Sequence, residues 1–89
     1  MNVIKVSARS RTAAVAGAIA GVMREVSRAE VQAIGAGAVN QALKAIVIAK
    51  GYLAEEGVAI VCDTSFVEVF IDEQERTAIS IVVEPRNQP

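Results

Sequence analysis

The sequence has no histidine and a single cysteine, Cys62, among its 89 residues. One thiol excludes an internal disulfide, and a chain without histidine has neither a Cys/His zinc site nor an imidazole base for catalysis. Cys62 stands in the apolar run VAIVC, where a thiol packs as a small hydrophobic group, so we expect it to be buried. We therefore expect no catalytic residue, no metal and no cofactor, which favours a binding or structural protein over an enzyme.

Aromatic residues and long hydrophobic runs are also scarce. Aromatics make up 3% of the sequence and hydrophobic residues 53%, so the core must be built from Val, Ile and Ala. The longest run without a polar side chain, residues 13–23, has 11 residues, whereas a membrane span needs about 20. No cationic segment followed by a long apolar stretch opens the chain, so we expect no secretory signal, no membrane partner and a cytoplasmic location.

The periodicity of the apolar residues predicts one domain over residues 1–89. A strand at residues 2–6 precedes a helix that Thr12 caps and that runs to about Glu25, and a strand at 31–34 precedes a helix that ends at Gly51. A long strand at 58–71, bent or bulged near 63–65, then forms a terminal hairpin with a strand at 77–84. This strand–helix–strand start favours two parallel strands joined by a right-handed crossover.

Both helices carry an apolar stripe at helical spacing. We expect Val15, Ile19, Val22 and Met23 to be buried in the first helix and Val39, Leu43, Ile46 and Val47 in the second. Small residues one turn apart, Gly17 with Gly21 and Ala16 with Ala20, indicate close packing. The opposite face of the second helix would expose the short or apolar residues Gln41, Ala45 and Ile48, which we interpret as a subunit contact.

A glycine turn joins the second strand to the second helix. Gly35 and Gly37 permit positive φ and leave room for a ligand near the main chain, at the positive end of a helix dipole. A plain tight turn explains two glycines equally well. The choice between the two readings therefore depends on the residues around the turn.

Those residues favour phosphate. Because parallel strands end at the same edge of a sheet, the SARSR loop and the glycine turn should emerge side by side. Neither loop, nor the helix start beyond it, contains a carboxylate. The predicted anion site consists of Arg9, Arg11, Gly35, Gly37, Asn40 and Lys44.

The charges divide along the chain. Residues 1–54 carry seven basic and two acidic side chains, a net charge of +5, and residues 55–89 carry two basic and eight acidic ones, a net charge of −6. A basic half can attract polyanions even when the whole molecule is near neutral. Solvated surface charge, or attraction between the basic and acidic ends of neighbouring subunits, remains the alternative.

The segments VIKVSARS, VAGAIAGVMRE, VQAIGAGAVNQALKAIVIAKGYL and ERTAISIVVEPR resemble the bacterial stage V sporulation protein S family, over residues 2–86. That family is similar to the Alba group of small chromatin proteins. The resemblance implies an α+β, two-layer βαβαββ Alba-like fold, with two helices packed on one face of a mixed four-stranded sheet, and an assembly that is usually dimeric. It also implies basic residues in the first loop, here Arg9 and Arg11, and a glycine-rich helix start followed by a lysine, here Gly35, Gly37 and Lys44.

The tip of the hairpin departs from that group, in which the arm is basic or polar and follows the minor groove. Here the tip reads Asp72-Glu73-Gln74-Glu75, which DNA phosphates would repel. Phe66 and Phe70 share a face of the preceding strand, where they either stack on bases or pack on the sheet or a second subunit.

We therefore expect a nonspecific nucleic-acid-binding protein, a regulator in sporulation or cell development, that holds the phosphate backbone through its two loops. DNA and RNA are both candidate partners, and the assembly is a homodimer or a homotetramer. The alternative is a structural or regulatory assembly protein that acts through protein–protein contacts without binding nucleic acid.

Overall fold

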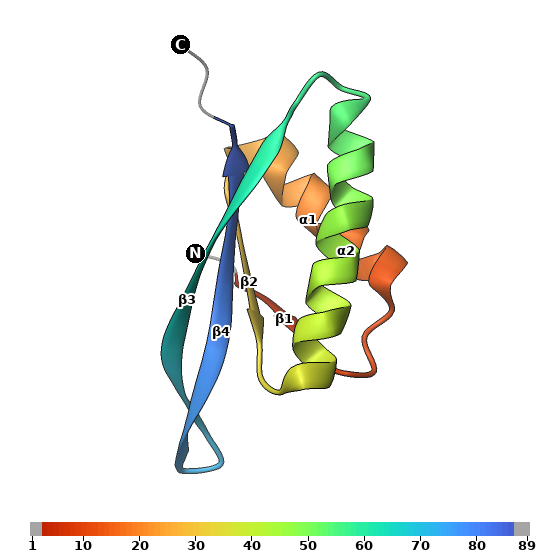
Figure 1. The fold of residues 1–89 in the computed structure, drawn as a ribbon. Coiled ribbons are helices and arrows are strands. Elements are labelled where there is room, and N and C mark those ends of the chain that lie inside the picture. Colours follow the sequence, from red (N-terminus) through yellow and green to blue (C-terminus); the bar gives the residue numbers. More distant parts are fainter. Residues whose placement is uncertain (1–2, 87–89) are drawn as a thin grey trace.

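The chain folds in the order βαβαββ (Figure 1). The computed structural model describes residues 3–86. Its elements are β1 (Val3–Val6), α1 (Thr12–Val26), β2 (Ala29–Ala33), α2 (Ala36–Ala54), β3 (Ile60–Ile71) and β4 (Gln74–Pro85). This order and the mixed sheet confirm the predicted α+β class.

The four strands form one sheet in the order β1-β2-β4-β3. β1 runs parallel to β2, with Val6 opposite Ala33, so both strands end at the same edge. β4 is antiparallel to β2 and pairs with it only as far as Ile79, which lies opposite Ala33. The central position of β2 and β4 makes β3 an edge strand.

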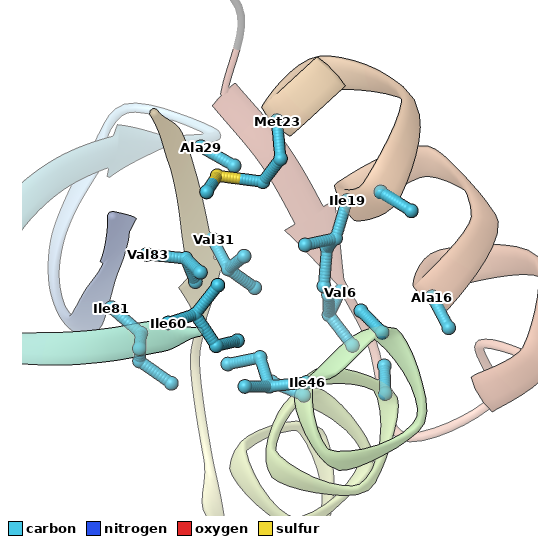
Figure 2. Close-up of a cluster of buried hydrophobic side chains, with 14 of the residues drawn as sticks. Val6, Ala16, Ile19, Met23, Ala29, Val31, Ile46, Ile60, Ile81 and Val83 are labelled. Carbon is cyan, nitrogen blue, oxygen red and sulfur yellow. The ribbon is translucent and has the colours of Figure 1, made fainter. Parts of the chain in front are cut away.

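The two helices cover one face of this sheet, and the main core lies between the two layers. Alternate residues of β2 are buried against the helices, as the period of two in a strand requires. Figure 2 shows Ile19 and Met23 of α1 and Ile46 of α2 pointing toward Val31 and Val83 of the sheet. The buried side chains are aliphatic, as the composition predicts.

The helices pack against each other through alanines. The fully buried small residues are Ala16 and Ala20 of α1 and Ala42, Ala45 and Ala49 of α2. Side chains this small allow two helix backbones to approach closely. The predicted buried stripe of α1 is confirmed for Ile19 and Met23, whereas Val15 and Val22 are half-buried.

Three expectations for the helices are wrong. Leu43 and Val47 of α2 are exposed, because the alanine face and not the stripe of larger residues turns toward α1. Gly17 of α1 is exposed, with no atom within 4 Å of the position of a Cβ, so it makes no close packing contact. α2 also continues past Gly51 for another turn, to Ala54.

Among residues 3–86, neither helix has both the length and the apolar character that a membrane span requires.

β3 and β4 extend beyond β2 as a two-stranded arm, which we call the hairpin arm and define as residues 67–78. Figure 1 shows it projecting past the end of β2. The predicted bulge is wrong, since each residue of β3 from Ile60 to Ile71 has one partner on β4. The arm reverses at Asp72 and Glu73, whose φ angles of 51° and 61° fit a two-residue turn of the type that suits strand twist.

The position of β3 explains two further outcomes. Cys62 is exposed, contrary to the prediction, because β3 lies at the edge of the sheet. Phe66 and Phe70 are 77% and 75% exposed, so they do not pack on the sheet of their own subunit. Stacking on a base or contact with a second molecule remains for these two rings.

Candidate nucleic-acid interface

The segments that follow β1 and β2 are in direct contact, between the loop after β1 and the first two turns of α2. A Cβ built on Gly37 would lie 3.0 Å from the Cβ of Ala8, so any larger residue at position 37 would require Ala8 to move by a few tenths of an ångström. The Gln41 side chain of α2 donates a hydrogen bond of 2.8 Å from Nε2 to the carbonyl oxygen of Ser10. We call residues 7–11 and 34–37 together the loop rim. Its two halves lie side by side, as the parallel strands predict.

Two serines hold the first loop of the rim in shape. The Ser7 N–H donates to Ser10 Oγ at 2.9 Å, and the Ser10 N–H donates to the Ser7 carbonyl at 3.1 Å. The Arg9 N–H also donates to Ser7 Oγ, at 3.2 Å. These bonds use the N–H groups of Ser7, Arg9 and Ser10, whereas the side chains of Arg9 and Arg11 are exposed.

α1 begins without a capping side chain. Arg11, not the expected Thr12, is the N-cap residue, with an extended backbone and no side-chain cap. The first helical bond runs from the Val15 N–H to the Arg11 carbonyl at 3.0 Å. The N–H groups of residues 12–14 therefore have no acceptor within the helix and point out of its positive end.

α2 begins in the same way, at a glycine. Gly35 has φ 91° and ψ 156°, a conformation that is essentially restricted to glycine, and it too makes no side-chain cap. The Val39 N–H bonds to the Gly35 carbonyl at 3.0 Å, which leaves the amides of residues 36–38 without a helical acceptor. Neither helix has an acidic residue in its first turn. Two uncapped positive helix ends thus lie next to each other.

The cations of the rim are exposed and unpaired. Within residues 3–86, no ion pair involves Arg9, Arg11 or Lys44, all three of which are exposed. Lys44 follows Gln41 by three residues on α2, and Asn40 and Gly37 are also exposed. Of the six residues predicted to bind phosphate, Arg9, Arg11, Gly35 and Gly37 therefore lie in the loop rim, whereas Asn40 and Lys44 lie farther along α2.

Arg24 shows what a structural arginine looks like in this protein. It lies near the end of α1 and binds Glu56, in the turn after α2, with 2.6 Å between Nη2 and Oε2. The hydrogen bond from Arg24 lowers the pKa of the Glu56 carboxyl, and the pair borders a cleft of about 460 Å³. This cleft lies at the far ends of both helices from the rim, and Arg24, one of the two arginines that line it, is already paired.

The predicted subunit contact on α2 does not have the expected exposure. Ala45 is fully buried, so the prediction that it faces solvent is wrong. Gln41 is half-buried and bound to Ser10, and Ile48 is half-buried against the core. All three residues therefore make contacts within their own subunit.

Lys5 is a further cation at this edge, which the loop motifs did not predict. It is an exposed residue of β1 that lies opposite Gln32 of β2, directly before the first loop. A lysine that alternates with apolar residues in a strand leading to a basic loop was the signal available in the sequence. Lys5 extends the positive edge onto the uncovered face of the sheet.

The fold and the rim define a small α+β protein with two helices on a mixed four-stranded sheet and a basic edge formed by two βα loops. The family model for Stage V sporulation protein S (SpoVS) matches residues 2–86. The chain therefore belongs to the Stage V sporulation protein S family, as its sequence motifs predict. This membership suggests a role related to sporulation.

Proposed function

We propose that this protein is a nonspecific nucleic-acid-binding module of the cytoplasm, not an enzyme, and that the loop rim holds the phosphate backbone. The observation that carries the proposal is the contact between two loops that bring Arg9 and Arg11 next to two uncapped helix ends. Cations without carboxylate partners retain their full attraction for phosphate. Backbone amides at a helix start add donors that fit a phosphate oxygen.

Phosphate contacts carry no sequence information, so binding should be nonspecific and sensitive to salt. The proposed assembly is a homodimer or homotetramer. A dimer in which each subunit supplies Arg9, Arg11 and Lys44 would neutralise about six phosphates, which gives a slope of log affinity against log salt near −5 on duplex DNA. DNA and RNA both fit this mode of binding.

The test removes the rim arginines. The double variant Arg9→Gln with Arg11→Gln should weaken binding at low salt and reduce the slope from about −5 to about −2, because only the two lysines of a dimer remain. A salt series of fluorescence anisotropy titrations with labelled duplex DNA, single strands and RNA measures both quantities.

The matched control is Arg24→Gln with Lys50→Gln, which removes the same charge from residues outside the rim. This control should retain most of the slope, since charges beyond about 8–10 Å are screened. Equal slopes for the wild type and the rim variant would contradict the proposal.

One observation favours the second candidate function, a structural or regulatory protein that acts through protein contacts. Large apolar side chains are exposed on α2 and β3, among them Val47, Phe66 and Phe70. Exposed apolar residues that gather on two elements are typical of a surface that meets another protein. Sedimentation at micromolar concentration tests assembly, and an oligomer with no affinity for any nucleic acid would favour this function over the first.

A further inference from the structure

A groove of about 580 Å³ opens where β1 and β2 end. One wall comes from the end of β1 and the first two residues of the loop rim, Ser7 and Ala8. The other wall is the hairpin arm, through Val69 and Ile71. Ser7 and Ala8 thus belong both to the groove and to the rim, so a ligand held on the rim lies at the mouth of the groove.

The groove combines apolar sides with a polar base. Val69, Ile71 and Ile34 are aliphatic, whereas Lys5 and Gln32 are opposite each other on neighbouring strands and point to the same face of the sheet. Gln32 is half-buried, and no hydrogen bond within residues 3–86 uses its side-chain amide. Its amide group offers both a donor and an acceptor to a ligand.

No carboxylate lines the groove, although the acidic turn at Asp72 follows directly after Ile71. The positive charge of Lys5 in the groove is offset by the acidic turn beside it, so the groove is more suitable for a neutral group than for a second phosphate. Its volume falls within the range of about 300–1,000 Å³ that small-molecule sites occupy.

We propose that this groove receives an unstacked nucleobase from a single-stranded segment whose phosphates lie on the loop rim, an inference that rests on the proposed function. A base has flat apolar faces and polar edges, which match the aliphatic walls and the free amide of Gln32. Bases in a duplex are stacked and paired, so only a single strand presents one in this way. The groove thus gives the rim a preference for single strands.

The experiment compares a short single-stranded oligonucleotide with an abasic strand of the same length, which keeps the phosphates and lacks the bases. The wild type should bind the base-bearing strand about tenfold more tightly, because a base in the groove removes its own apolar surface and that of the aliphatic walls from water. Ile71→Ala removes part of one wall and should reduce this preference to about threefold. Gln32→Ala removes the amide and should lower it in the same direction, with circular dichroism confirming that both variants fold.

Val61→Ala is the matched control. Val61 lies on the same strand, points to the same face and is 41% exposed against 42% for Ile71, but it does not line the groove. This variant should keep the full preference for the base-bearing strand.

The outcomes separate this inference from the function on which it rests. Equal binding of the two strands by the wild type would overturn the groove while leaving phosphate binding by the rim in place. Equal effects of Ile71→Ala and Val61→Ala would overturn it as well. Failure to bind either strand would overturn the rim and the groove together.

Discussion

Gly37 and Ala8 are the residues at which the two halves of the loop rim meet. The φ angle of Gly37 is not positive, so its requirement for glycine comes from space: the position of a Cβ lies 3.0 Å from the Cβ of Ala8. Gly35, with φ 91°, is needed for its conformation instead. The two positions in this turn therefore favour glycine for different physical reasons.

Gly37→Ala should push the first loop away from α2. Alanine favours a helix by up to about 1 kcal/mol over glycine, which offsets the cost of the tighter contact, so the free energy of unfolding should change little. Displacement of Arg9 should weaken binding to a single strand about threefold to tenfold. The second change Ala8→Gly restores the space, so the double variant should regain most of the affinity. Anisotropy titrations measure binding, and urea unfolding measures stability.

Gly17→Ala serves as the control because nothing lies within 4 Å of its added Cβ. It should stabilise the exposed middle of α1 by roughly 0.5–1 kcal/mol and leave binding unchanged. Affinity equal to that of the wild type in Gly37→Ala would show that the contact between the loops does not position Arg9.

The residues of the rim could be predicted from the sequence because the relevant information is local. A basic loop, a glycine turn and a stretch without carboxylates can all be read from neighbouring letters, and the crossover rule places the two loops together. The exposure of Cys62 could not be read in this way, because it depends on which strand lies at the edge of the sheet. Periodicity gives the faces of a strand but not its place in the sheet order.

At the scale of elements, α2 shows how a helical stripe can mislead. Its larger residues predict a buried face through Leu43 and Val47, yet these two are exposed and Ala42, Ala45 and Ala49 are fully buried. Hydrophobicity scales give large apolar side chains the highest values, whereas two helices that pack closely require small side chains at their contact. Ala16 and Ala20 of α1 already indicated close packing in the sequence. They did not indicate which face of α2 is buried, because that depends on the fold.

The ends of α1 and α2 are joined by the Arg24–Glu56 ion pair, which makes one contribution to stability dependent on pH. The pKa of Glu56 lies below its ordinary value of 4.5 in the folded protein. A lowered folded pKa means that the contribution is complete above pH 4.5 and is lost as the pH falls through the folded value. Both side chains are exposed, so the effect should be small and should shrink in salt.

Glu56→Gln should therefore be less stable than the wild type near neutral pH and equal to it in acid. Thermal unfolding across this range measures the difference. The control Glu55→Gln removes the same charge from the neighbouring residue, which has no ion pair within residues 3–86. A difference between wild type and Glu56→Gln that persists unchanged in acid would show that the ion pair is not its source.

At the scale of the whole molecule, the acidic turn of the hairpin arm and the basic loop rim lie at the same end. The hairpin arm ends in Asp72 and Glu73, and it borders the groove whose other wall is part of the loop rim. The acidic turn can act in two ways. It can repel the phosphates of a nucleic acid that approaches the rim, or it can attract the rim of a second copy of the chain.

The variant Asp72→Asn with Glu73→Gly separates these effects, since Asn-Gly suits the positive φ angles of the turn and removes two negative charges. If repulsion dominates, affinity for a single strand should rise about threefold to tenfold at low salt, and the gain should shrink as the Debye length falls. The control Glu25→Gln with Glu55→Gln removes two charges elsewhere and should gain much less. Equal gains would assign the effect to net charge alone. If the turn instead joins copies of the chain, sedimentation of the turn variant at low salt should show a smaller assembly than that of the wild type.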